Sequence, residues 1–306
     1  KQGGNYAYVI DKNQRDPNMV AYLINQLRVQ GIEVHRRVSG AEKGAYVVLL
    51  NQPYSGFADA LLSRQNYPKK AKHNPYDDIA WTYGLMYGVD VKLIKESKKF
   101  STVGLELLTK DIVATGKVTG KGTNLVINYK AQNEILPMLY AVTSNNKKVK
   151  VKMATKAFTH NKDSLSAGSI ILSGANRKTV GMIKKMGLDV VKSTKNASNI
   201  ISRNVKLPRI AIYHNWYNTQ AEGWARFTFE NRKIPYTSID KDDLKNGDLN
   251  KRFDIILIPH TSGNVESMIH GIDTKWGPMP YTKTTEFPNH GYPDATDDMT
   301  GGPGFS

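Results

Sequence analysis

Histidines are the residues of this sequence most able to bind a metal or move a proton, and there are seven among 306 residues. None lies in an H-E-x-x-H or H-x-x-E arrangement, the spacing that places two zinc ligands on one helix face. The sequence has no cysteine, which excludes disulfides, cysteine-ligated zinc, iron–sulfur clusters and a thiol nucleophile. We therefore expect no metal site, no catalytic residue and no cofactor in this chain.

Six residues in the last third of the chain are weaker candidates for a ligand site. They gather near the ends of two expected strands, and the carboxyl ends of strands are where α/β sheets bind ligands. Glu222 and Arg226 are four residues apart and can pair on one helix face. The candidate ligand-binding residues are Tyr213, His214, Trp216, Glu222, His260 and Ser262.

Other interpretations of these six residues stay open. The aromatic residues could form a packed cluster instead of a pocket, and Thr261–Gly263 could be a plain turn between a strand and a helix. An enzyme with Ser262 as nucleophile, assisted by His260 and Glu222, is a further hypothesis. The sequence has no G-x-S-x-G elbow around a serine, which disfavours that hypothesis.

The net charge of +16 is spread along the chain. Its densest part runs from Lys147 to Lys156, where lysines alternate with apolar residues between Lys148 and Met153. This period of two predicts a strand with one solvated face and one buried face. No RNP, zinc-finger or helix-turn-helix signature accompanies the charge, so we expect no specific nucleic-acid partner. No run of about 18 apolar residues is present, so we expect no membrane-spanning helix.

The chain begins with short apolar runs that alternate with helical patterns, which is typical of α/β folds. Pro17 is a good first-turn residue and Gly31 a helix stop, and the last apolar run is continuous enough to be buried on both faces. A strand, a helix and a strand in succession predict a β-α-β unit of a parallel sheet. The expected elements are strands Tyr6–Ile10, Ile32–Arg37 and Ala45–Leu50, and helices Pro17–Gln30 and Phe57–Arg64.

A similar order of elements recurs further along the chain. Its expected elements are strands Leu125–Tyr129, Val149–Ala154 and Ser169–Leu172, and helices Glu134–Thr143 and Arg177–Met186, the last closed by Gly187. The segments Lys43–Leu49 and Ser166–Leu172 occupy matching places in the two stretches. We interpret the two stretches as a diverged internal duplication. The alternative is that any two α/β segments look alike at this level.

A third α/β stretch begins at Pro208. Its strand Phe253–Pro259 has consecutive apolar residues, so we expect it inside a sheet, next to Arg209–Tyr213 and parallel to it. The helix that follows the first strand is expected to cover one face through Ala221, Trp224, Ala225 and Thr228. The other expected elements are helix Thr219–Glu230, strand Tyr236–Ile239, helix Lys241–Asn246 and the start of a helix at Glu266–His270.

The sequence thus predicts three domains. These are an α/β unit at 1–118, a second at 119–206 packed with the first, and a third at 207–306 that ends in an irregular tail, 271–306. Open α/β sheets usually have about five or six strands, more than the third stretch supplies. We therefore expect the natural protein to continue past Ser306, although the first half of the chain could complete the sheet instead. The expected fold class is α/β, with mostly parallel sheets flanked by helices.

Two groups of segments, taken together, resemble a known family over about residues 5–260, with order and spacing kept. The first group is Leu50–Tyr54, Leu61–Pro68 and Pro75–Val89, and the second is Pro208–Tyr213, Glu222–Arg226 and Arg252–Pro259. They resemble the region downstream of the catalytic domain in large secreted bacterial zinc carboxypeptidase-like proteins, where a glutamine-amidotransferase-like domain follows the peptidase. The resemblance implies flavodoxin-like or class I glutamine-amidotransferase-like units.

The resemblance also implies a parent protein that is a zinc metallocarboxypeptidase, a hydrolase of peptides, in a secreted or periplasmic location. The family's zinc ligands, a histidine–glutamate pair and a later histidine, have no match here, and the amidotransferase cysteine is absent. We therefore expect a non-catalytic accessory fragment whose partner is its own upstream peptidase domain, where the zinc is bound. The alternative is an autonomous peptide- or carbohydrate-binding module whose pocket uses aromatic residues near Trp81 and Trp216.

Overall fold

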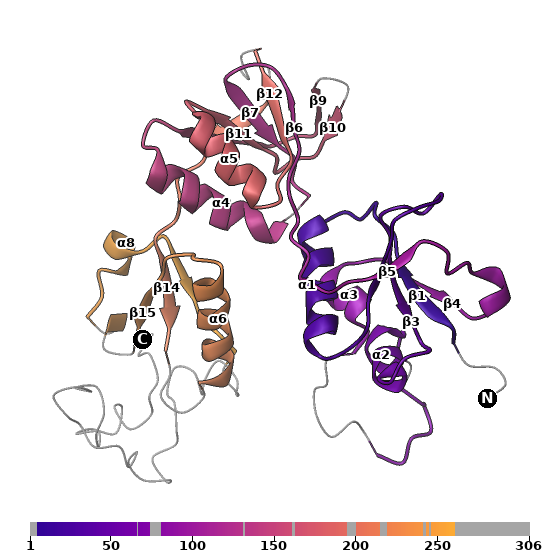
Figure 1. Cartoon of the computed structure of the whole chain (residues 1–306). Coiled ribbons are helices and arrows are strands. Elements are labelled where there is room, and N and C mark those ends of the chain that lie inside the picture. Colours follow the sequence, from indigo (N-terminus) through magenta and orange to yellow (C-terminus); the bar gives the residue numbers. More distant parts are fainter. Residues whose placement is uncertain are drawn as a thin grey trace, which may run out of the picture. The chain divides into compact units, whose positions relative to one another are not determined.

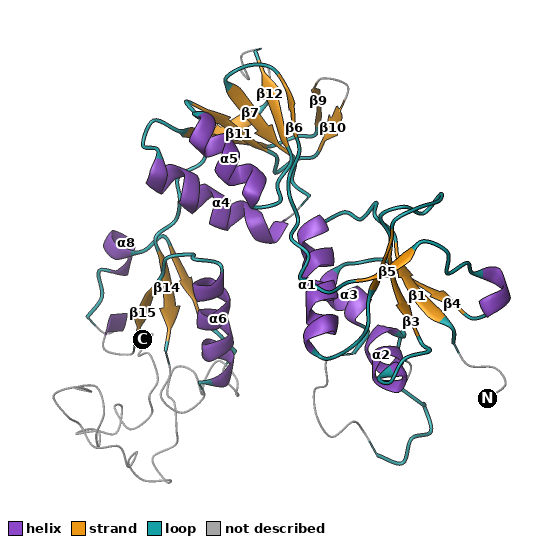
Figure 2. Cartoon of the chain, in the orientation of Figure 1, coloured by secondary structure: helices purple, strands orange, loops and turns teal. Residues whose placement is uncertain are grey.

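The computed structural model describes most of the chain up to residue 260 (Figure 1). It divides into a first unit, residues 1–138 with 142–204, and a second unit, residues 139–141 with 205–306. The described strands form sheets of five, six, three and two strands, joined by helices (Figure 2), so the α/β class expected from the sequence is confirmed. The described residues are 5–65, 67–73, 81–130, 132–160, 163–194, 200–214, 219–240, 243–244 and 246–260.

The first five strands form the N-terminal module of the first unit. The strand order is β4-β1-β3-β2-β5, and every neighbouring pair is antiparallel. The strands are β1 (Ala7–Ile10), β2 (His35–Arg37), β3 (Tyr46–Leu49), β4 (Val91–Ile94) and β5 (Leu105–Leu107), and the helices are α1 (Pro17–Val29), α2 (Ser55–Leu62) and α3 (Tyr83–Tyr87).

The next stretch of chain forms the middle module of the first unit. Its main sheet has the order β13-β8-β11-β7-β12-β6, in which only the pair β12 and β6 is parallel. The short strands β9 (Phe158–His160) and β10 (Asp163–Leu165) pair separately as a hairpin. The other elements are β6 (Val118–Gly120), β7 (Asn124–Ile127), α4 (Gln132–Asn145), β8 (Lys150–Ala154), β11 (Ile170–Ser173), α5 (Arg177–Lys185), β12 (Val190–Ser193) and β13 (Ser202–Asn204).

Both modules contain the same β-α-β-β-α-β arrangement, known as ferredoxin-like or split β-α-β. In the N-terminal module the arrangement consists of β1, α1, β2, β3, α2–α3 and β4, and in the middle module of β7, α4, β8, β11, α5 and β12. In both sheets these four strands lie side by side in the order fourth, first, third, second. The segments matched in the sequence, Lys43–Leu49 and Ser166–Leu172, contain β3 and all but the last residue of the equivalent strand β11. Descent of the two modules from one duplicated unit stays a prediction.

The expectation of mostly parallel sheets is wrong for the first unit. The helix α1 does connect two strands that run the same way, but β3 inserts between β1 and β2 and is antiparallel to both. In the middle module β11 inserts between β7 and β8 in the same manner. The inserted strands are apolar on both faces because both sides of the sheet are covered, and such a run does not distinguish a parallel from an antiparallel neighbour.

Helix α1 shows how local sequence builds the covered face of the N-terminal module. The carboxylate of Asp16 accepts hydrogen bonds from the backbone N–H groups of Asn18 and Met19, and Pro17 opens the first turn. The helix then buries Leu23, Ile24 and their neighbours in a core that includes residues of β1, β3 and α2. The sequence prediction of a helix from Pro17 is therefore confirmed.

The other face of the N-terminal sheet is also covered, by a segment around Phe100. Val9 and Val47 are buried on this face, with Phe100 packed against their cluster. Arg37, whose side chain is 7% exposed, donates hydrogen bonds to the carbonyl oxygens of Ser101 (2.8 Å) and Val103 (3.0 Å). Its guanidinium also lies 4.9 Å from the centre of the Phe100 ring. This buried cation fastens the covering segment to the sheet.

The second unit contains a three-stranded parallel sheet in the order β15-β14-β16. Its elements are β14 (Ile210–Tyr213), α6 (Gln220–Asn231), β15 (Thr237–Ile239), α8 (Leu249–Arg252) and β16 (Ile255–Leu257). The expected neighbours β14 and β16 are adjacent and parallel, as predicted. The expectation that β16 lies inside the sheet is not met among the described residues, where it is an edge strand with Ile255 48% exposed. The expected helix Glu266–His270 and the tail 271–306 lie outside the described residues.

Helix α6 packs on its sheet with a different face from the one expected. Ala221 and Ala225 are partly buried as predicted, but Trp224 is 62% exposed and Thr228 is exposed. The Trp224 and Phe227 rings contact each other edge to face on the outside, with centroids 6.0 Å apart. The buried side chain of this helix is that of Glu222. The spacing of apolar residues therefore predicted the wrong inner face for α6, because the carboxylate of Glu222 occupies the buried face.

Candidate functional site

The residues predicted to form a ligand site lie at the carboxyl edge of the parallel sheet. Tyr213 ends β14, His214 follows it, and His260 comes three residues after the end of β16. Because β14 and β16 are parallel neighbours, these ends meet at the same edge of the sheet. Trp216 and Ser262 lie outside the described residues.

The structure brings His214 and Glu222 together. Glu222 lies in the first turn of α6, its side chain is 5% exposed, and Oε2 is 3.5 Å from Nδ1 of His214. Its other oxygen, Oε1, is 3.5 Å from a guanidinium nitrogen of Arg226, which is the i, i+4 pair that the sequence predicts. The backbone N–H of His214 donates to the carbonyl oxygen of Ile239 at 2.7 Å and so fixes the start of the loop. The buried carboxylate thus has a basic side chain beside each of its two oxygens.

A second pair of side chains holds Arg226 in place. Arg226 donates to the hydroxyl of Tyr236 at 3.2 Å, and this hydrogen bond, together with the charge of Glu222, raises the pKa of the guanidinium against the opposing effect of burial. Tyr236 in turn donates to Glu230 at 2.6 Å, and burial and this carboxylate raise the pKa of its hydroxyl. Arg226 is therefore a permanent cation beside Glu222.

The remaining two described candidates differ from this pair. The Tyr213 side chain is 3% exposed and belongs to a core cluster with Ala211, Ile239 and Phe253, so its ring packs inside the unit. His260 is exposed. Of the four described candidates, the structure thus places His214 and Glu222 in contact, Tyr213 in the core and His260 at the surface.

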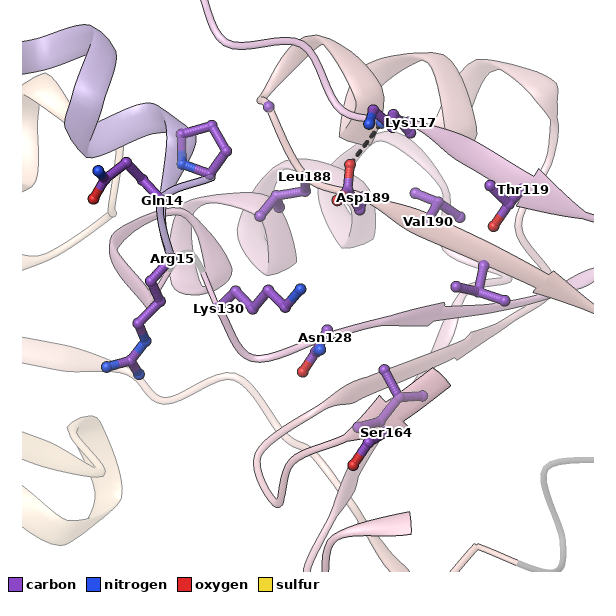
Figure 3. A pocket seen from close by; sticks show the side chains of 14 residues that line it. Gln14, Arg15, Lys117, Thr119, Asn128, Lys130, Ser164, Leu188, Asp189 and Val190 are labelled. Carbon is purple, nitrogen blue, oxygen red and sulfur yellow. Dashed lines mark hydrogen bonds between the residues drawn. The ribbon is translucent and has the colours of Figure 1, made fainter. Parts of the chain in front are cut away.

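A pocket in the first unit was missed by the sequence analysis. It has a volume of about 280 Å³ and lies where the loop before α1 meets the middle module (Figure 3). Three cationic side chains, Arg15, Lys117 and Lys130, line it together with one carboxylate, Asp189. Its other lining residues are Gln14, Pro17, Thr119, Asn128, Ser164, Leu165, Gly187, Leu188, Val190 and Val191.

Hydrogen bonds fix the walls of this pocket. The carboxylate of Asp189 accepts from the backbone N–H of Lys117 at 2.7 Å, and this bond is visible in Figure 3. Gln14 exchanges two hydrogen bonds with the backbone of Asp90, at 2.9 and 3.1 Å. The side-chain amide of Asn18 donates to the carbonyl oxygen of Met186 at 3.1 Å and joins the two modules beside the pocket. The pocket is therefore formed by residues whose backbone positions are already set.

No short sequence motif marks this pocket. Its charged residues come from four places: the loop before α1, the approach to β6, the turn after β7 and the turn after α5. The one local signal is that Asn128 and Lys130 follow a buried strand, in the position where polar residues often line a site. The four segments come together where the loop before α1 meets the middle module.

The described residues contain no group of three or more histidine and carboxylate side chains that could hold a metal ion. None of the helices in the described ranges is both long and apolar enough to cross a membrane. Compared with known proteins, the chain matches no family model, no curated protein and no solved structure.

Proposed function

We propose that this chain is a non-catalytic accessory part of a zinc carboxypeptidase-like protein, secreted or periplasmic, whose partner is the upstream peptidase domain of the same protein. The observation that carries the proposal is the parallel order β15-β14-β16. It corresponds to the second, first and third strands of a flavodoxin-like sheet, the kind of unit that the resemblance implies. Two of the resembling segments, Pro208–Tyr213 and Arg252–Pro259, contain the adjacent strands β14 and β16.

The arrangement around Glu222 supports a binding or packing role for this edge. Both carboxylate oxygens have a basic neighbour, His214 on one side and the permanently charged Arg226 on the other. The carboxylate beside Nδ1 orients the imidazole, which suits the presentation of His214 to a bound group or a neighbouring domain. The donor set does not fit zinc, because Arg226 opposes a second cation on the same carboxylate. In this proposal the zinc belongs to the upstream domain.

Peptidase assays on two forms of the protein test the accessory role. The chain alone and the full reading frame that encodes it are each incubated with zinc and with peptides, and the released carboxyl-terminal amino acids are measured. We expect release only from the longer protein. A control variant of the chain, Glu222→Gln, keeps the shape of the side chain and removes its charge. Release by the chain alone that is lost in Glu222→Gln, or a reading frame without an upstream peptidase domain, would contradict the proposal.

A second candidate function is an autonomous binding module for peptides or carbohydrates. The pocket of the first unit favours it, because a hollow of about 280 Å³ with charged, amide and apolar walls suits a small ligand or the end of a larger one. Arrays of peptides and glycans probed with the chain test this function. Binding that persists without any peptidase domain would support it over the accessory role.

A further inference from the structure

We propose that the pocket of the first unit binds the oxyanion group, a carboxylate or a phosphate, of a small ligand, with Lys130 Nζ and Asn128 Nδ2 as the direct donors. The proposal names a ligand class for the second candidate function and rests on it. Neither residue was singled out by the sequence, and both follow β7 in the middle module.

Asn128 presents its amide nitrogen to the pocket because its oxygen is engaged elsewhere. The Ser166 hydroxyl donates to Asn128 Oδ1 at 3.3 Å, and the Ser169 hydroxyl lies 3.5 Å from the same oxygen. In Figure 3 the nitrogen of Asn128 lies on the side of Lys130 and the oxygen on the opposite side. The backbone N–H of Lys130 donates to the carbonyl oxygen of Asn128 at 2.9 Å, which turns the chain so that both side chains face one hollow.

Lys130, an exposed residue, supplies a positive charge to the pocket that it lines. Figure 3 shows its side chain extending into the hollow between Asn128 and the turn at Leu188 and Asp189. Within the described part of the chain, no ion pair engages Lys130. The only lining carboxylate, Asp189, points to the backbone N–H of Lys117. An ammonium group in a hollow without an acidic partner favours an anionic ligand.

The other cations raise the positive potential of the pocket without filling it. Arg15 and Lys117 line it from the loop before α1 and from the approach to β6, and the side chain of Arg15 extends away from the hollow in Figure 3. Together with Lys130 they make three cations against one carboxylate. Such a field speeds and strengthens anion binding and weakens with salt.

The pocket is pre-organised and partly apolar. Gly187 has a φ of +74°, and a Cβ there would lie 2.4 Å from Oδ1 of Asn18. The backbone of Gly187 therefore lies too close to the Asn18 side chain for a residue with a Cβ to fit without a shift. Leu165, Leu188 and Val190 are buried and line the pocket. Rigid walls lower the entropic cost of binding, and the apolar lining suits a ligand with a small aliphatic part beside its oxyanion.

Titration calorimetry on the full chain tests this site with defined probes. The probes are inorganic phosphate, N-acetyl-valine with a free carboxylate, and N-acetyl-valine amide, which has the same shape without the charge. We expect one of the two anions to bind and the amide to bind at least tenfold more weakly, because hydrogen bonds to charged groups account for about that factor or more. The stronger anion identifies the source of the oxyanion.

Three variants locate the binding. Lys130→Gln and Asn128→Asp are each expected to weaken binding of the anion at least tenfold, the second by placing a carboxylate against the ligand. Lys152→Gln removes the same charge from an exposed position on β8 and is the matched control. It is expected to change the affinity less than twofold. The side-chain amide resonance of Asn128 in a ¹⁵N spectrum should shift when the anion is added.

Several results would overturn the oxyanion site. They are equal affinities for the anion and the amide, equal losses in Lys130→Gln and Lys152→Gln, and binding of nucleic acid with no binding of either small anion. A peptide or glycan that binds the chain but is not displaced by phosphate or N-acetyl-valine would reject this site and leave the second candidate function standing. No binding to the arrays and none to the anions would reject both.

Discussion

The two modules of the first unit share a topology and differ in what lies on the helix-free face of the sheet. In the N-terminal module this face is sealed by the segment around Phe100, which Arg37 fastens by two hydrogen bonds and a ring contact. In the middle module, cross-strand pairing places Thr119, Val191 and Lys152 on one face. Thr119 and Val191 line the pocket, and Lys152 is exposed, as its alternation with Val151 predicts.

This difference shows how one arrangement of strands can supply either a core or a site. Both sheets bury the central strand, β3 or β11, on both faces. Away from the central strand the two differ, because the N-terminal module uses the buried Arg37 to hold its covering segment, whereas the middle module leaves Lys117 and Lys130 exposed at the pocket. The location of a site therefore follows from the loops and edge strands, not from the shared order of the strands.

The largest expected effect comes from removing the Arg37 guanidinium, which holds the covering segment on the N-terminal sheet. Arg37→Met should lower the free energy of unfolding of the N-terminal module by about 3 kcal/mol, because two carbonyl oxygens of the covering segment lose a buried, charged donor. The measurement is urea unfolding, with amide hydrogen exchange in β2 and β3 to assign the loss to this module. The matched control is Lys152→Met at an exposed position of β8 in the middle module, where we expect a change within about 0.5 kcal/mol. Equal losses would remove the distinction between the two faces.

A substitution at Gly187 tests whether the pocket wall in the middle module is tightly packed. Gly187→Ala should lower the free energy of unfolding by about 2 kcal/mol, since it combines a positive φ with a close approach to Asn18. Gly181→Ala is the control in the preceding helix, where a Cβ meets open space. That variant should be more stable by about 0.5–1 kcal/mol. Thermal unfolding of both variants distinguishes them, and a Gly187→Ala variant as stable as the natural chain would show that the wall is not tightly packed.

The smallest effect concerns the parallel sheet of the second unit. Asp254 accepts hydrogen bonds from the backbone and the guanidinium of Arg209, and these lower the pKa of its carboxyl well below its usual range. A carboxyl group whose pKa is lower in the folded than in the unfolded state stabilises the fold at pH values above the unfolded-state pKa of about 3.9. This stabilisation is lost as the pH falls towards the folded-state pKa. Asp254→Asn should therefore be less stable than the natural chain at pH 7, with the difference narrowing below about pH 4.

Urea unfolding at several pH values checks this dependence. The control is Asp248→Asn, whose carboxylate pairs with exposed Lys251 at 2.8 Å and should contribute little. A difference between Asp254→Asn and the natural chain that stays constant down to pH 2 would show that the carboxylate is not the source of the stability.

Local signals in the sequence predicted some of the elements. Pro17 and Gly31 were expected to bound the first helix, and its predicted start at Pro17 agrees with the structure. The strands β4 and β12, which complete the two modules, were not predicted. The parallel pairing of β14 with β16 was also predicted, from the continuous apolar run of Phe253–Pro259, which is typical of strands in parallel sheets. The insertion of β3 and β11 was not, since strand order depends on contacts between residues far apart in the chain.

The features of the candidate sites were likewise predictable from the sequence only where they depend on local spacing. The pairing of Glu222 with Arg226 follows from helical spacing, and the structure adds His214 to it. The pocket could not be predicted, because Arg15 and Asp189 approach it from different modules. The exposure of Trp224 was also hidden, since the apolar period of a helix does not reveal a buried carboxylate on its inner face.

The inserted central strand has a consequence for the order in which the chain can fold as it is made. β1 and β2 leave the ribosome early, but neither has its central partner until β3 has been synthesised, so the N-terminal sheet cannot form while only the first β-α-β segment has emerged. Helix α1 is different, because its cap and its hydrogen bonds are local to residues 16–29. The same delay repeats at β11. Each module is therefore expected to appear in one step, when its third strand arrives, and not strand by strand.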